Sequence, residues 1–146
     1  MIMAYKLLIL VHVIAMMSWV GAMYFNLTLL FPMYKSQGGN RYADLMQAQG
    51  TRAAPLLYLL IVLTLVSGGC LAMLGNASLA QPQTLAKLVC LLLMLGCHLY
   101  GSLVLWPRVF FALDSEKEGL FFAYRLSMFV SASAGTAAII ASYLWK

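Results

Sequence analysis

Three ionisable side chains, His12, Lys87 and His98, lie within long apolar runs of this chain. An Arg, Lys or Asp at the centre of a membrane helix costs about 2.5–3.5 kcal/mol, so such residues mark functional sites by default. His12 and His98 are the only histidines in the sequence. Imidazole is the commonest metal ligand among side chains. A bound metal ion or haem is therefore the first hypothesis.

Each histidine has a methionine four residues away, Met16 beside His12 and Met94 beside His98. This spacing places the two side chains of a pair on one helix surface. Imidazole and thioether together suit Cu(I) or the axial positions of a haem iron. The alternatives are that the methionines pack, that the histidines form hydrogen bonds between helices, and that Lys87 extends to the membrane surface.

The spacing along each helix limits which groups can meet. His12 and Trp19 are seven residues apart, two helical turns, and share a face. Lys87 and His98 are eleven residues apart, also on one face but about 16 Å apart along the axis. They cannot both bind one metal ion from the same helix. His12 and Lys87 lie at compatible depths in their own runs.

The composition is that of an integral membrane protein. Of the 146 residues, 64% are hydrophobic and 9% are charged, against about 25% charged in a soluble domain. We interpret residues 1–146 as one transmembrane domain. The net charge of +5 comes from scattered basic residues, which predict contacts with lipid head groups and no nucleic-acid partner. The three cysteines form no C-x-x-C motif and predict no disulfide framework.

Four apolar runs, at about residues 7–33, 54–74, 85–106 and 120–145, predict membrane-spanning helices. The connections are predicted at residues 34–53, 76–84 and 107–119. Short connections favour antiparallel neighbours. The expected fold is all-α, an integral membrane four-helix bundle with up-down-up-down topology.

The basic residues predict the orientation of the chain in the membrane. Six flank the first and third connections and three lie at the other ends of the spans. The positive-inside rule then places the first and third connections in the cytoplasm and both termini outside. The two sets are Lys35, Arg41, Arg52, Arg108, Lys117 and Arg125, and Lys6, Lys87 and Lys146.

Several segments resemble a known family. The first run contains LVHVIAMMSWVG at residues 10–21, a histidine followed seven residues later by tryptophan and then by glycine. The third run contains Lys87-Leu88 and, eleven residues after the lysine, His98. These patterns resemble the HemJ-type protoporphyrinogen oxidases and their relatives, the small copper-resistance-D (CopD)-like membrane proteins. Further similarities are Arg52 with Pro55, the run Ser67-Gly68-Gly69, and Tyr124-Arg125.

The resemblance to the HemJ-type enzymes implies a b-type haem and oxidation of protoporphyrinogen IX to protoporphyrin IX. It implies that His12 and Lys87 are the axial ligands of the haem iron, with Lys87 deprotonated. It also implies that the side chains of His98, Trp19, Arg52 and Arg125 line the site. Electrons would pass to a membrane acceptor such as a quinone. The expected location is a bacterial inner membrane with both termini periplasmic.

The chain departs from the HemJ pattern at two places. HemJ-type proteins carry an L-P-R-like segment and another histidine near the end of the first helix, where this chain has residues 27–33, LTLLFPM. Their fourth helix has an N-E-x-P motif shortly after the arginine, where Met128 and Phe129 stand here. The runs at residues 19–23 and 29–32 are closer to the CopD-like branch.

Two other interpretations therefore stay open. The first is a CopD-like copper-binding or copper-transfer protein whose ligands are His12, Met16, Met94 and His98. The second is a non-catalytic membrane subunit in which the histidines are structural. Whether the chain is an enzyme, and whether it forms a homo-oligomer, are also left open by the sequence.

Overall fold

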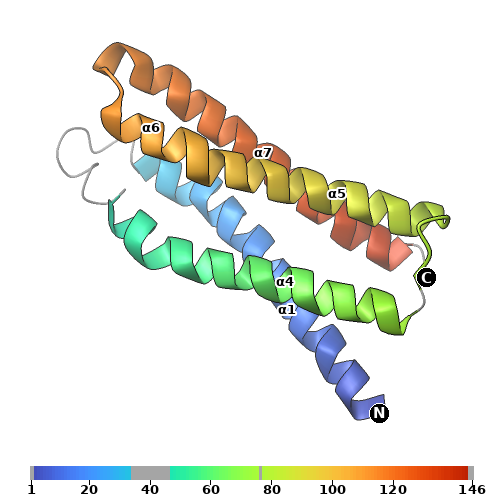
Figure 1. The fold of residues 1–146 in the computed structure, drawn as a ribbon. Coiled ribbons are helices and arrows are strands. Elements are labelled where there is room, and N and C mark those ends of the chain that lie inside the picture. Colours follow the sequence, from blue (N-terminus) through green and yellow to red (C-terminus); the bar gives the residue numbers. More distant parts are fainter. Residues whose placement is uncertain (1, 34–46, 76, 145–146) are drawn as a thin grey trace. The chain divides into compact units, whose positions relative to one another are not determined.

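The computed structural model of the chain describes residues 2–33, 47–75 and 77–144 (Figure 1). All of the regular structure in these residues is helical, which confirms the predicted all-α class. The chain divides into two compact units, Met1–Ala77 and Ser78–Lys146. Each unit contains two long antiparallel helices.

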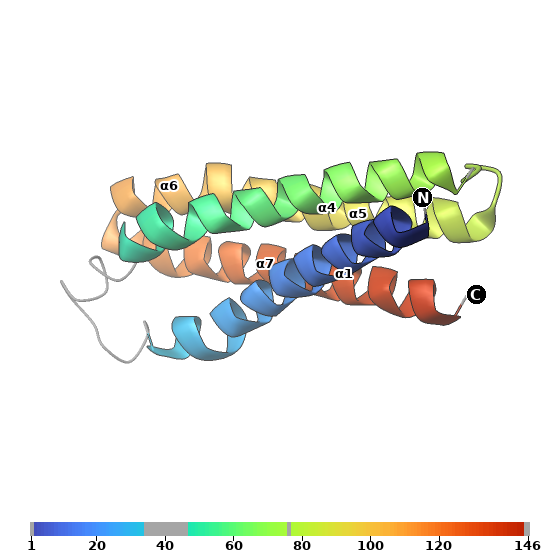
Figure 2. The same ribbon diagram turned by 90° about the horizontal axis from the view of Figure 1, so that it is seen from below.

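The first unit pairs the helices α1 (Ile2–Phe25) and α4 (Ala54–Leu74). Figure 2 shows them running in opposite directions. Short π-helical segments, η1 (Asn26–Leu30) and η2 (Gln49–Ala53), extend α1 at its end and α4 at its start. The buried Asn26 side chain accepts a hydrogen bond from the Gln49 amide at this end of the unit. The polar pair thereby joins the two helices within an otherwise apolar surface.

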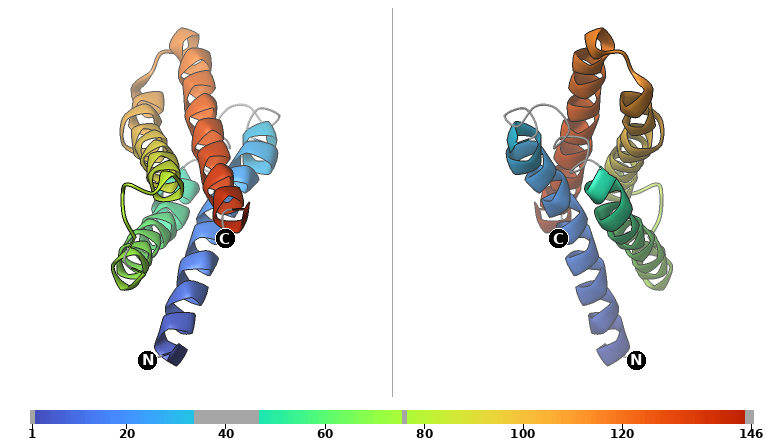
Figure 3. Two further views of the ribbon diagram at one scale, coloured as in Figure 1. Left: turned by 90° about the vertical axis from the view of Figure 1, so that its right-hand side faces the viewer. Right: turned by 90° about the vertical axis from the view of Figure 1, so that its left-hand side faces the viewer.

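The second unit pairs α5 (Pro82–Leu99) with α7 (Asp114–Leu144). Helix α5 continues through η3 (Tyr100–Leu105) and α6 (Trp106–Phe111) before the turn into α7 (Figure 3). Two serines of α7 donate hydrogen bonds to backbone carbonyls of α5, Ser127 to Cys97 at 2.6 Å and Ser131 to Met94 at 2.7 Å. Small residues that let backbones approach, and hydroxyls that bond across helices, are typical of membrane helix pairs.

Four helical stretches are long and apolar enough to cross a membrane, as the sequence predicts. They are Ile2–Met33, Gln49–Leu74, Pro82–Val109 and Ser115–Leu144. Large apolar side chains such as Leu56, Val66 and Leu103 are exposed on them. These surfaces suit contact with lipid. The orientation in the membrane stays a prediction.

Three of the four prolines explain the three π-helical segments. A proline cannot donate a backbone hydrogen bond, and its ring crowds the carbonyl four residues earlier. Pro32, Pro55 and Pro107 each follow a π-helical segment by two residues. The residue before each proline donates its N–H to the carbonyl five residues back, Phe31 to Asn26, Ala54 to Gln49 and Trp106 to Gly101. The wider turn is the local response to each proline.

The third connection differs from the prediction, which was wrong for residues 107–119. Pro107 lies in the first turn of α6, a position that proline tolerates, and Asp114 already begins α7. The non-helical link is Ala112 and Leu113. Acidic residues here are favourable at a helix start, and the Glu116 carboxylate accepts the Leu113 N–H at 3.4 Å. The charges therefore mark a helix N-terminus and not a loop.

The first connection is also shorter than predicted. Residues 47–53 are helical, so the second span begins earlier than residue 54. Residues 34–46 lie outside the described part of the chain, as do residues 145 and 146 at the end of the fourth span.

Gly101 of η3 packs closely against α7, and its replacement gives a test of this packing. An added Cβ would overlap the Cε methyl of Met128, a side chain that is only 2% exposed. We expect Gly101→Val to lower the free energy of unfolding by about 1–3 kcal/mol, measured by denaturation in mixed detergent micelles. The matched control is Gly96→Val, because a Cβ at Gly96 meets nothing within 4 Å. Equal stability of the two variants would contradict this packing.

Candidate functional site

His12 projects from α1 onto α4 in the first unit. Its Nδ1 atom lies 2.9 Å from the hydroxyl oxygen of Ser67. The imidazole also makes a hydrogen bond to the Thr64 backbone carbonyl, which lies one turn before Ser67 on α4. The side chain is partly exposed. His12 is thus held by the neighbouring helix and does not point freely into lipid.

The network around Ser67 bears on which imidazole nitrogen carries the hydrogen. The single hydroxyl hydrogen of Ser67 is directed to the Leu63 carbonyl, 2.5 Å away on the same helix. If Ser67 then accepts a hydrogen from His12, that hydrogen is on Nδ1, and the Thr64 carbonyl must share the same N–H. A neutral imidazole protonated at Nδ1 has a lone pair at Nε2. This is the form in which histidine binds a metal ion, with its other nitrogen fixed by a hydrogen bond.

Gly68 makes room for the imidazole on α4. A Cβ at this position would lie 2.9 Å from Cε1 of His12 and 3.4 Å from its Nδ1. Any larger residue would press on the ring. Gly69, the next residue, has nothing within 4 Å of an added Cβ. The pair Ser67-Gly68 therefore forms a cradle, a hydrogen-bond acceptor beside an open backbone surface, for this one side chain.

The other predicted site residues of the first unit lie along the same helices. Trp19 and Met16 are buried, with exposed fractions of 0% and 8%. Arg52 is exposed in η2. It precedes Ser67 by fifteen residues, roughly 20 Å along a helix. The structure brings Ser67 to His12 but does not bring Arg52 next to it.

The second unit contains the remaining predicted residues, Lys87, Met94, His98 and Arg125. His98 and Met94 are buried, with exposed fractions of 4% and 0%. Ser131 of α7 donates to the backbone carbonyl of Met94, and Ser127 donates to that of Cys97, the residue before His98. Lys87 is partly buried near the start of α5, and Arg125 is exposed on α7. Lys87 and His98 are separated along α5, as predicted.

The residues predicted for copper divide between the two units. His12 and Met16 belong to the first unit, and Met94 and His98 belong to the second. Within the described part of the chain, no group of three or more His, Cys, Asp or Glu side chains could hold a metal ion. The cysteines Cys70, Cys90 and Cys97 are free thiols.

Two polar features were not predicted from the sequence. The first is Ser67 as the partner of His12, and the second is the amide pair Asn26 and Gln49. A polar residue inside an apolar run is itself a signal, and Asn26 and Ser67 both stand in such runs. The sequence could not predict either pair, because each depends on how the two helices face each other.

Comparisons of the chain with known protein families, with curated proteins and with solved structures found no match. What the fold establishes is a helical chain with four candidate membrane spans. Its most constrained candidate ligand is the imidazole that Ser67 and Gly68 hold.

Proposed function

We propose that this protein is a haem b-binding integral membrane protein in which His12 is an axial ligand of the iron. The observation that carries the proposal is the hydrogen bond from His12 Nδ1 to Ser67. That bond orients the imidazole, and in the tautomer that donates from Nδ1 it leaves Nε2 free to bind the metal.

The donor set around His12 suits haem better than a bare metal ion. A porphyrin supplies most of the ligands of its own iron, so one or two protein side chains complete the coordination. A structural zinc ion instead takes about four protein ligands. The apolar surfaces of the spans also suit a macrocycle. When bound, the haem would supply one-electron redox chemistry.

We further propose a HemJ-like oxidoreductase activity on protoporphyrinogen IX or a related tetrapyrrole. Its support is the resemblance of the His12–Trp19 and Lys87–His98 spacings to that family. In this activity the protein orients the tetrapyrrole and accepts its electrons and protons, and a quinone or another membrane acceptor takes the electrons. Lys87 as second axial ligand, and contacts from Trp19, His98, Arg52 and Arg125, remain predictions of the same resemblance.

The cofactor is tested on the purified wild-type protein. We expect a Soret band and a pyridine haemochrome spectrum of haem b, with iron and haem in equal amounts. Colourless protein that carries stoichiometric copper would instead support the copper interpretation. Protein that binds neither group when both are supplied would support the structural interpretation and contradict the proposal.

The reaction is tested separately from the cofactor. A bacterial strain that lacks its own protoporphyrinogen oxidase should regain haem synthesis when it expresses this chain. The matched control is Ser18→Ala, an exposed position on α1, which should restore growth equally. A protein that reaches the membrane and binds haem, yet does not restore growth, would contradict the oxidase activity and leave the haem site standing.

A further inference from the structure

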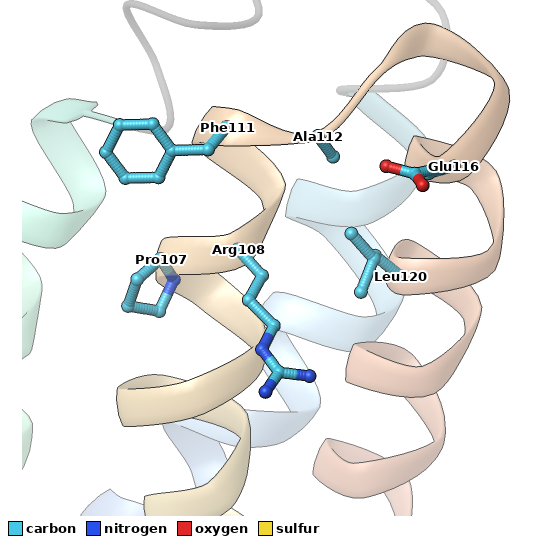
Figure 4. A pocket seen from close by; sticks show the side chains of 6 residues that line it. All are labelled: Pro107, Arg108, Phe111, Ala112, Glu116 and Leu120. Atoms are coloured by element: carbon cyan, nitrogen blue, oxygen red, sulfur yellow. The ribbon is translucent and has the colours of Figure 1, made fainter.

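An open pocket lies at the turn between α6 and α7 in the second unit (Figure 4). Its volume is about 520 Å³, within the range of roughly 300–1,000 Å³ that holds small molecules. The lining residues are Pro107, Arg108, Phe111, Ala112, Glu116 and Leu120. One is a cation, one is an anion and the other four are apolar. This site is independent of the haem proposal.

The spans place this pocket at the boundary of the membrane. One candidate span ends at Val109 and the next begins at Ser115. Arg108 thus stands at the end of one span and Glu116 at the start of the next. Phe111 is 90% exposed and Leu113 is 68% exposed, so apolar side chains surround the turn. Such a mixture of apolar surface and charge is typical of the head-group region.

The two charges differ in depth along the helices. Figure 4 shows the Arg108 side chain extending away from the turn, toward the middle of the helices, whereas the Glu116 carboxylate lies beside the turn. The Arg108 guanidinium therefore lies farther from the turn, toward the middle of the candidate spans, than the Glu116 carboxylate. Leu120 projects from α7 between the levels of the Glu116 carboxylate and the Arg108 guanidinium.

This order of groups is complementary to a phospholipid whose head group ends in an ammonium. In such a lipid the acyl chains lie deepest, the phosphate lies above them and the ammonium is outermost. Guanidinium binds phosphate in a bidentate manner. A carboxylate accepts hydrogen bonds from an ammonium. In Figure 4 Leu120 and Pro107 lie between the two charged groups, where they offer apolar contact.

We propose that this pocket binds the head group of phosphatidylethanolamine, with its phosphate on Arg108 and its ammonium on Glu116. Phosphatidylglycerol has the phosphate but no ammonium. Phosphatidylcholine has a trimethylammonium, which has no N–H to donate to the carboxylate. The pocket should therefore distinguish the three head groups.

The test is native mass spectrometry of the delipidated full chain with the dilauroyl forms of these three lipids. We expect phosphatidylethanolamine to be retained about tenfold more strongly than the other two, the effect of one hydrogen bond to a charged group. Equal retention of all three lipids would overturn the proposal, and this comparison needs no variant.

Two substitutions assign the two contacts. Arg108→Gln should weaken retention of all three lipids, and Glu116→Gln should remove the preference for phosphatidylethanolamine, each by about tenfold. The matched controls are Lys6→Gln and Glu118→Gln, exposed charges that do not line the pocket. If Glu118→Gln removes the preference as fully as Glu116→Gln does, the assignment is overturned.

A final experiment distinguishes binding of a lipid from binding of a soluble phosphate ester. Glycerophosphoethanolamine carries the same head group without acyl chains. It should fail to displace the lipid at equal concentration, because it lacks the contacts of the acyl chains with the exposed apolar surface of the spans. Displacement at equal concentration would overturn the assignment to a lipid.

Discussion

His12→Ala should remove the haem from the purified protein. The substitution takes away the only imidazole of the first unit, and with it the proposed bond to the iron. Loss of an outer partner of a ligand costs about 10–100-fold in metal affinity, so loss of the ligand itself should cost more. The measurement is the Soret absorbance per protein after purification in detergent.

Two controls accompany this substitution. Ser18→Ala is exposed on the same helix and should keep the wild-type absorbance. Circular dichroism of His12→Ala should show an unchanged helix content, because the four spans do not depend on one partly exposed side chain. A folded His12→Ala protein with the wild-type haem content would show that another residue binds the iron.

Gly68→Val should displace the His12 imidazole without changing the ligand. Its Cβ would lie 2.9 Å from Cε1 of the ring, and its two methyl groups would crowd the ring further. The hydrogen bond to Ser67 cannot then keep its geometry. We expect haem affinity to fall by about 10–100-fold, measured by haem titration of the apoprotein.

Gly69→Val is the matched control for this effect. The same substitution one residue later meets open space, so it should bind haem as the wild type does. Both variants add one β-branched residue to α4, and both therefore carry the same change in helix propensity. Equal haem affinities for the two variants would mean that the contact between Gly68 and His12 has no part in the site.

The spans could be predicted from the sequence because length and apolar composition alone identify them. The ends of the spans were predicted less accurately than their existence. Pro107 and the acidic run from Asp114 look like a loop by composition, yet a proline in the first turn and acids at a helix start are both compatible with helix. The pattern of apolar residues also does not predict the π-helical segments before Pro32, Pro55 and Pro107.

Residues of the candidate site were singled out from the sequence, but their contacts with one another were not predicted. His12 was singled out because a histidine in an apolar run is costly, and the structure places it against α4. Its partner Ser67 lies fifty-five residues away. Packing decides which faces of two helices meet. Here the absence of a side chain at Gly68 lets the His12 ring approach α4. The spacing of residues within a single helix cannot predict such a contact.

The central claim, that His12 Nε2 binds the haem iron, is tested most directly by chemical rescue. His12→Gly leaves a space in which free imidazole can take the place of the lost side chain. We predict that His12→Gly purifies without a Soret band and that haem added together with imidazole restores it. A His12→Gly protein that keeps its haem without imidazole would contradict the account.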